Sequence, residues 1–270
     1  MQQPQRSDQP TETWANSTAY EAYIGRWSRR VAGEFLRWLA IASDQRWLDV
    51  GCGSGALTQT ILAQMQPIEI KGVDRSDGFV GFLRETVHDP RVTFEVADAQ
   101  SLPFEADRFD VAVSGLVLNF VPDPASAVRE MARVTRGGGT VAAYVWDYAG
   151  QMHLIRYFWD AAVALDPSVR DRNQSELFPI CQPDALRALF EGAGLHEVVV
   201  RGIEIDMIFR DFDDYWRPFL GGQGPAPSYA MSLSENDRVA LRERIRSRLP
   251  VAVDGSITLL ARAWAVRGRT

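Results

Sequence analysis

The chain has 270 residues, of which 46% are hydrophobic and 24% charged, and its formal net charge is −6. This composition is typical of a globular protein with a packed core and argues against a disordered or fibrous chain. Lys71 is the one lysine, and the arginines are scattered along the chain, which argues against a nucleic-acid partner because such partners need clustered positive charge. Cys52 and Cys181, the two cysteines, are too few for a disulfide framework and lack metal-ligand spacing.

The N-terminal residues are polar, and no stretch reaches the roughly 18 apolar residues of a membrane-spanning helix. We therefore expect a cytoplasmic protein without membrane insertion, either a monomer or a homodimer. The length suits one α/β domain with insertions. Ahead of that domain, residues 19–40 place Val31, Phe35, Leu36 and Leu39 at helical intervals, which predicts one or two helices.

Residues 46–146 alternate apolar strands with amphipathic helices. The first strand, RWLDV at 46–50, leads through a glycine-rich turn into a helix over 56–65. The same pattern predicts strands over 67–74, 91–98, 109–118 and 138–146, with helices over 77–87 and 123–136 and a glycine stop at Gly137. This alternation indicates a doubly wound parallel sheet with helices on both faces.

Beyond residue 146 the alternation is interrupted twice. Residues 151–165 predict an extra helix before the next regular helix at 183–195, and strands follow at 196–209 and 256–268. Between these strands, a loop rich in glycine and proline precedes an amphipathic helix. We therefore predict residues 41–270 to be a single domain with lid insertions at about 148–180 and 210–250.

The turn after the first strand, in LDVGCGSGALT, contains Gly51, Gly53 and Gly55. Glycines there let backbone N–H groups approach a ligand closely. Gly51, Gly53 and Ala56 fit the G-x-G-x-x-A pattern of nicotinamide cofactors, whose pyrophosphate the turn would hold. The same turn suits S-adenosylmethionine, so the glycines alone leave both ligand classes open.

Three acids bear on this choice. Asp74, at the end of the second strand, would meet ribose hydroxyls in either class. Asp49 stands just before the turn, where a carboxylate would repel a pyrophosphate but attract the cationic amino group of a methionine moiety. Asp98 follows the third strand, at the edge where an adenine amino group would be read, although an isolated aspartate there is also typical of a turn or cap. Asp74 does not discriminate between the two classes, whereas Asp49 and Asp98 together favour S-adenosylmethionine.

The chain resembles the class I S-adenosylmethionine-dependent methyltransferases in five segments taken in order, LDVGCGSG, GVDRS, ADAQSLPF, FDVAVSGLVLNFVPDP and MARVTRGGGTVAAYVW. The resemblance is to the small-molecule branch that includes the quinone-biosynthesis C-methyltransferases, and it covers roughly residues 45–146. It implies a Rossmann-like sheet of seven strands whose last strand is antiparallel. It also implies S-adenosyl-L-methionine as cofactor, S-adenosyl-L-homocysteine as product, and no metal.

The resemblance assigns the methionine half of the cofactor to positions around the glycine turn. Gly51, Gly53 and Gly55 would lie against the methionine portion, with Asp49 beside its amino group. Ser114, at the end of the fourth strand, would lie next to it.

The adenosine half is assigned to the neighbouring strand ends. The resemblance gives the ribose hydroxyls to Asp74 and the adenine to Asp98 with the backbone of Ala99. Arg75 and Ser76 would flank the adenine.

The segment AYEAYIGRWS resembles the N-terminal segment that covers the cofactor in such enzymes, so residues 1–40 are interpreted as a tail followed by cofactor-covering helices. Arg26 would pair with the cofactor carboxylate, and Tyr20, Tyr23 or Trp27 would face the sulfonium or the acceptor. The alternative is that this aromatic stripe is ordinary packing at helical spacing.

The open edge of the sheet should bring Asn119, Trp146, Asp147, Tyr148 and His153 together, since the site of such sheets lies at the carboxyl ends of the strands. His153 and Asp147 are the candidate bases, with surface packing and helix capping as their alternatives. Many relatives have a histidine at the position of Asn119, and an amide cannot act as a base at neutral pH.

Aromatic residues of the predicted lids suggest an apolar or aromatic acceptor, with ordinary packing as the equal alternative; they are Phe158, Trp159, Tyr215, Trp216 and Phe219. Residues 212–227, rich in glycine and aromatics, would form a gate. Trp146, Tyr148 and Trp216 are accordingly predicted pocket residues.

The leading hypothesis is methyl transfer to a small organic acceptor by in-line displacement, which needs no protein nucleophile. A protein that binds the cofactor without catalysis is one alternative. An NAD-dependent oxidoreductase is the other, although Lys71 as the one lysine provides no Y-x-x-x-K proton relay.

Overall fold

The structure is a computed structural model that describes residues 21–222 and 224–270. Tyr20, one of the predicted pocket residues, lies outside the described residues. The strands are β1 (Arg46–Val50), β2 (Glu69–Asp74), β3 (Val92–Val96), β4 (Phe109–Gly115), β5 (Thr135–Trp146), β6 (His196–Phe209) and β7 (Ile257–Arg269). The longer helices are α2 (Arg26–Leu39), α3 (Ala56–Gln64), α4 (Asp77–Thr86), α5 (Pro124–Val134), α6 (His153–Leu165), α8 (Pro183–Gly192), α10 (Pro225–Ser232) and α11 (Glu235–Arg246). The shorter helical segments are η1 (Glu21–Gly25), η2 (Leu118–Phe120), η3 (Pro167–Arg172), α7 (Gln174–Leu177), α9 (Phe212–Trp216) and η4 (Arg217–Gly221).

The seven strands form one sheet in the order β3-β2-β1-β4-β5-β7-β6. Strands β1 to β5 pair in parallel, whereas β7 is antiparallel to both β5 and β6. This arrangement confirms the predicted Rossmann-like methyltransferase fold with an antiparallel last strand. Because β1, β2, β4 and β5 run in the same direction, their carboxyl ends meet at one edge of the sheet.

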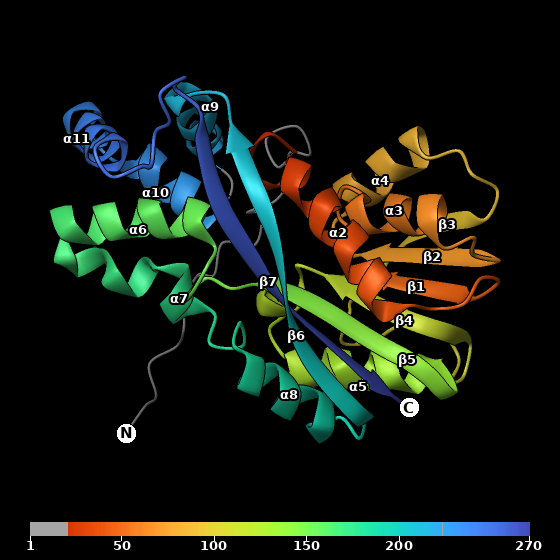
Figure 1. Cartoon of the computed structure of the whole chain (residues 1–270). Helices are drawn as coiled ribbons and strands as arrows, with labels where there is room; N and C mark the ends of the chain where they lie inside the picture. The colour runs from red at the N-terminus through yellow and green to blue at the C-terminus, as the bar shows by residue number, and fades with distance from the viewer. Residues whose placement is uncertain (1–20, 223) are drawn as a thin grey trace, which may run out of the picture.

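Helices cover both faces of the sheet. In Figure 1, α2 and α3 lie above it and pack on each other, while α5 and α8 lie below it. The predicted apolar face of α2, with Val31, Phe35 and Leu36, is completely buried. Trp47, Leu48 and Val50 of β1 are likewise buried, as expected of a central strand with helices on both sides.

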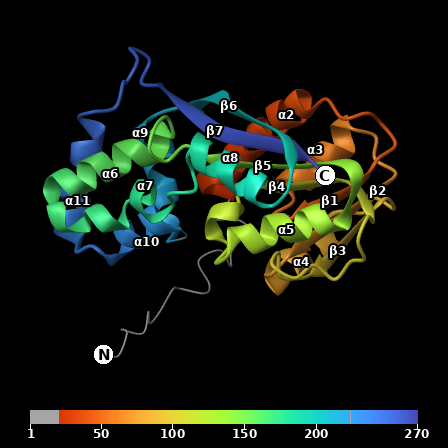
Figure 2. The same cartoon turned by 90° about the horizontal axis from the view of Figure 1, so that it is seen from below.

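Two groups of helices interrupt the alternation at the predicted places, and we call them together the helical insert. The first group, α6, η3 and α7, lies between β5 and α8, and the second, α9 to α11, lies between β6 and β7. Figures 1 and 2 show both groups gathered at one end of the sheet, where α6 contacts α10 and α11. The loop rich in glycine and proline that was predicted ahead of the amphipathic helix was wrong, since α9, η4 and α10 occupy most of that segment.

The junction of α5 and β5 also differs from the prediction. Helix α5 ends at Val134 and β5 begins at Thr135, so Gly137 does not stop a helix. The neighbouring Gly139 is required by packing, because a Cβ there would lie 2.5 Å from Thr135 Cγ2 and 2.8 Å from the Asp110 carbonyl oxygen.

Within the described part of the chain, no helix combines the length and apolar character needed to cross a bilayer. The cellular location stays a prediction.

Candidate cofactor site

The glycine turn between β1 and α3 opens at the carboxyl edge of the sheet. Gly51 N and Cys52 N both donate to the Val73 carbonyl, which anchors the turn to β2. Gly51 has a φ of +77°, and a Cβ there would lie 2.5 Å from Val117 Cγ1. At Gly53, with a φ of +50°, the nearest atom to such a Cβ would be the Gly51 carbonyl oxygen at 3.9 Å. The packing therefore excludes side chains at Gly51, while the backbone of Gly53 stays open to a ligand.

Asp49 is buried directly beneath this turn, with only 1% of its surface exposed. Thr58 Oγ1 donates to Asp49 Oδ2 at 2.6 Å, whereas Asp49 Oδ1 has no hydrogen-bond partner among the described residues. Burial raises the Asp49 pKa to about 7, and the nearby Asp74 carboxylate contributes to the increase. A buried carboxylate with one unpaired oxygen is a site that a cation such as an ammonium group would stabilise.

Asp74, the last residue of β2, is joined to the same turn. Its Oδ2 accepts from Gly53 N at 3.0 Å and its Oδ1 from Ser76 N at 2.9 Å. Burial raises the Asp74 pKa, against the lowering effect of these N–H donors and of Arg75. Since each carboxylate oxygen has a second lone pair, Asp74 can still accept from two ribose hydroxyls.

Asp98 follows β3 and lies at the surface. Its Oδ1 accepts from Gln100 N at 2.9 Å, and the hydrogen bonds from Gln100 lower its pKa. Arg75 acts electrostatically on both Asp98 and Asp74, so all three lie at one end of the sheet. In the described structure Asp98 is a turn residue. Ser76 caps the N-terminus of α4, because its Oγ accepts a hydrogen bond from Phe79 N. Their contacts with adenine, and that of Ala99, stay predictions.

Ser114 is completely buried at the end of β4. Its hydroxyl donates to the Val50 carbonyl at 2.8 Å and so links β4 to β1. The geometry supports a structural role for this hydroxyl more than the predicted contact with the methionine portion.

Arg26, at the start of α2, pairs with a residue of the helical insert. Its Nη1 lies 3.1 Å from Asp214 Oδ1 of α9, and its guanidinium lies 4.5 Å from the ring centroid of Trp27 and 4.9 Å from that of Phe209. The predicted partner was the cofactor carboxylate. Its Nε and Nη2 are buried and have no hydrogen-bond partner among the described residues, so they are the atoms through which Arg26 can still reach a ligand.

Two aromatic pairs reinforce this contact. Tyr23 packs on Phe219 with ring centroids 5.3 Å apart, and Trp27 packs on Phe209 at 5.4 Å. We call these two pairs and the Arg26–Asp214 ion pair the N-terminal latch. Sequence reasoning missed this latch because Arg26 and Asp214 are 188 positions apart in the chain. A local sequence pattern contains no information on such a distant pairing.

Asp147 follows β5 and is held by several donors. Arg262 Nε and Nη2 donate to its Oδ2 at 2.9 and 2.7 Å, Gln151 N donates to the same oxygen, and Gly150 N donates to Oδ1. Its side chain is 3% exposed. The carboxylate therefore fixes the chain where it leaves β5, an arrangement that argues against the predicted role as a base.

His153 is the first residue of α6 and is half-buried. Burial lowers the His153 pKa, and Arg156 one turn further along α6 lowers it again. Its ring lies 6.2 Å from that of Tyr157 on the same helix. The structure thus places His153 on the helical insert, beyond the end of β5, and its role as a base stays a prediction.

The aromatic residues of the predicted lids are mostly packed on one another. Phe158 stacks on Phe219 at 4.7 Å, and Trp216 lies 5.9 Å from Phe219. Phe158, Phe219 and Trp216 are all buried. These aromatics form the core of the helical insert, so the packing alternative holds for this group.

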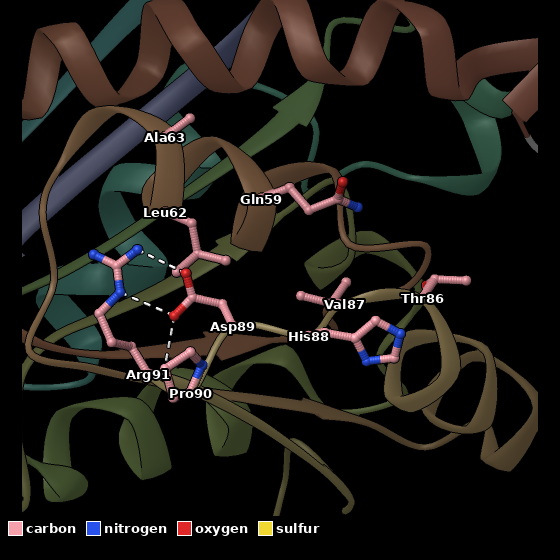
Figure 3. A pocket seen from close by; sticks show the side chains of 9 residues that line it. All are labelled: Gln59, Leu62, Ala63, Thr86, Val87, His88, Asp89, Pro90 and Arg91. Atoms are coloured by element: carbon pink, nitrogen blue, oxygen red, sulfur yellow. Dashed lines mark hydrogen bonds and ion pairs between the residues drawn. The ribbon is translucent and has the colours of Figure 1, made fainter.

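A groove of about 610 Å³ lies away from this edge, between α3 and the connection from α4 to β3. Figure 3 shows its lining, in which Asp89 pairs with Arg91 and His88 stands at one end. Because this connection leads into the amino end of β3, the groove opens at the opposite edge of the sheet from Asp74 and the glycine turn.

Comparison with known proteins adds to this geometry. A family model described as a methyltransferase domain matches residues 48–143. A ubiquinone/menaquinone biosynthesis C-methyltransferase of Geobacter sulfurreducens is 35% identical over 42% of the chain, which spans 45% of that protein. The demethylmenaquinone methyltransferase of Staphylococcus aureus is 28% identical over 65% of the chain, which spans 76% of that protein.

Among solved structures, phosphoethanolamine N-methyltransferase 2 of Haemonchus contortus, in complex with S-adenosyl-L-methionine, superposes with a TM-score of 0.59 and 18% identity. The superposition covers 96% of the chain and 57% of that protein, and at this identity it supports the fold alone.

Proposed function

Because residues 48–143 match a methyltransferase domain, we propose that the chain is a class I S-adenosylmethionine-dependent methyltransferase and transfers a methyl group from S-adenosylmethionine to a small aromatic acceptor. The observation that carries the proposal is the buried Asp49 carboxylate, whose Oδ1 lacks a partner among the described residues and which lies close enough to Cys52 of the glycine turn to act on it electrostatically. The amino group of the methionine portion would supply the missing cation. Asp74, already bonded to the glycine turn, would hold the ribose.

When bound, S-adenosylmethionine supplies a methyl group on a sulfonium, which is electrophilic without further activation. The chain then has to position the acceptor and exclude water. We propose that the helical insert and the segment from Tyr23 to Trp27 do so, because the N-terminal latch joins them over the carboxyl edge of the sheet.

The names of the two relatives support a proposal for the acceptor class. The names of both relatives refer to quinone compounds, whose reduced forms are hydroxylated aromatic rings. We propose an acceptor of that chemical type, an aromatic ring carrying oxygen substituents. Asp147 is held by Arg262, so we propose a reaction in which no carboxylate of β5 removes a proton from the acceptor.

Isothermal titration calorimetry tests the cofactor. S-adenosylmethionine, S-adenosylhomocysteine and NAD are titrated separately into the wild type, Asp98→Ala and Glu95→Ala, the last being a control that removes an exposed carboxylate from β3. We expect micromolar binding of the first two ligands, weakened about tenfold by Asp98→Ala, in line with the loss of a hydrogen bond to a charged group. Binding of NAD alone would overturn the proposal.

A non-catalytic cofactor-binding protein is the second candidate, favoured by the amide at Asn119 where many relatives have a histidine. Turnover separates the two. Radiolabelled S-adenosylmethionine is incubated with the protein and a panel of hydroxylated and aminated naphthalenes, and transfer to any member supports the enzyme. Tight cofactor binding with no transfer to the whole panel would support the second candidate.

A further inference from the structure

Several hydrogen-bond donors near the carboxyl edge are buried and have no partner among the described residues. Besides Nε and Nη2 of Arg26 and the indole N–H of Trp27, they are Tyr23 Oη, Asn119 Nδ2 and Trp146 Nε1. Tyr23 is 3% and Trp146 is 2% exposed. The great majority of buried polar groups in proteins have a hydrogen-bond partner, and each buried group without one lowers the stability of the fold. Three such donors from three different elements therefore suggest a ligand that supplies the acceptor atoms.

The elements that carry these donors meet near the end of β5. Trp146 is the last residue of β5, and η2, which contains Asn119, packs against β5. Tyr148 follows two residues later and acts electrostatically on Tyr23. The ring of Phe178 lies between the segment after β5 and η2. Its centroid is 5.7 Å from that of Tyr148 and 5.0 Å from that of Phe120, the neighbour of Asn119.

This position adjoins the glycine turn. Val117, two residues before Asn119, is the side chain that a Cβ on Gly51 would strike. Leu116 N donates to the Tyr144 carbonyl, which keeps the connection from β4 to η2 beside β5. A ligand at the three donors would thus be next to the methionine portion of a cofactor held by the turn.

The chemistry of the three groups is uniform. A phenol O–H, an amide N–H and an indole N–H are neutral donors, and the indole cannot accept. The ionisable groups around them include the buried phenols Tyr148 and Tyr215, which act on Tyr23, and Asp147, which is paired with Arg262 and lies near Cys181. Arg26, three residues after Tyr23, is the nearby cation and is paired with Asp214. Neutral donors stabilise an oxygen with developing negative charge, as in an oxyanion hole, and they oppose an amine, whose own N–H groups would face them.

We propose that Tyr23, Asn119 and Trp146 recognise an oxygen atom of the acceptor and favour its ionised form, a phenolate. This inference rests on the proposed methyl transfer and narrows its acceptor to hydroxylated rings. It assigns no proton transfer to a side chain, because the phenol releases its proton to solvent. The donors then hold the negative oxygen while the ring is presented to the cofactor.

A bound phenol reports on the donors by its absorbance, because 4-nitrophenol and its phenolate differ in colour. The ratio of bound phenolate to bound phenol is measured for the complex with S-adenosylhomocysteine in the wild type, Tyr23→Phe, Asn119→Leu and Trp146→Phe. Each variant should lower that ratio by about tenfold or more, since a hydrogen bond to a charged oxygen is lost. Tyr229→Phe, which removes a phenol hydroxyl from α10, is the matched control and should leave the ratio unchanged.

The outcomes distinguish the two proposals. If S-adenosylhomocysteine fails to bind the wild type, the proposed function itself fails. If it binds but neither 4-nitrophenol nor 1-naphthol binds to the complex, the oxygen site is overturned while the cofactor site stands. The same holds if the three variants match Tyr229→Phe, or if they weaken S-adenosylhomocysteine binding and leave the phenolate ratio alone. Calorimetric binding of S-adenosylhomocysteine by each variant shows that it is folded.

Discussion

Replacing Asp49 by asparagine should stabilise the ligand-free protein at high pH. Burial raises the Asp49 pKa from 3.8 to about 7, so the fold binds a proton that the unfolded chain releases. Between those two values stability falls as pH rises, because the native state binds more protons there than the unfolded state. Below 3.8 this carboxylate carries no penalty, and above about 7 the penalty is complete.

The magnitude follows from the shift. One pKa unit corresponds to about 1.4 kcal/mol, so the full penalty is about 4 kcal/mol, of which about 3 kcal/mol develops between pH 5 and pH 8. The asparagine oxygen can still accept from Thr58 Oγ1, although its amide N–H groups are then buried without a partner. That second cost is about 1–3 kcal/mol and independent of pH. The pH-dependent part of the difference between variant and wild type therefore isolates the ionisation.

Urea denaturation at pH 5 and pH 8, without ligand, measures this difference. We expect the free energy of unfolding of Asp49→Asn, relative to that of the wild type, to be about 3 kcal/mol higher at pH 8 than at pH 5, by the same linkage. Glu105→Gln, at an exposed loop carboxylate, should show no such gain. If the difference in unfolding free energy between Asp49→Asn and wild type is the same at both pH values, the claim that burial raises the Asp49 pKa is refuted.

Two further variants test the turn after β5. Gly150→Ala should lower the free energy of unfolding by about 2 kcal/mol or more, as overpacking does, because a Cβ there would lie 2.1 Å from Asp147 Oδ2. Gly137→Ala, with no atom within 4 Å of its Cβ, is the control. Equal urea midpoints for the two variants would contradict the packing. Arg262→Met should cost about 3 kcal/mol, because it leaves the buried Asp147 carboxylate without its charged partner, and a wild-type urea midpoint would show that the N–H donors alone suffice.

The sheet was predictable from sequence because its strands are short apolar runs separated by turn residues. β1 and β6 have the predicted bounds, and Asp49, next to the end of β1, and Asp74, at the end of β2, lie where the alternation places them. Local pattern and tertiary fold agree here, since a buried parallel strand needs apolar side chains on both faces.

The helical insert and the partners of the site residues were less predictable. Residues 213–227 contain glycine and proline, yet Pro218 and Pro225 stand in the first turn of η4 and α10, where proline is tolerated. The partners of Arg26 and Asp147 are Asp214 and Arg262, and both pairings depend on the completed fold. In both cases the fold supplies a counter-ion that the sequence alone does not reveal.

The N-terminal latch has a consequence for the order in which the molecule is made. Tyr23 and Arg26 are among the first described residues to leave the ribosome, whereas Asp214 and Phe219 are made almost two hundred residues later. During synthesis the sheet from β1 to β5 can fold as a unit, but the start of α2 has no partner until the second insertion is complete. The side chains of Tyr23 and Trp27 lack these partners for most of translation, so the enclosure over the carboxyl edge forms late in synthesis, when β7 is the one strand of the described chain still to be made.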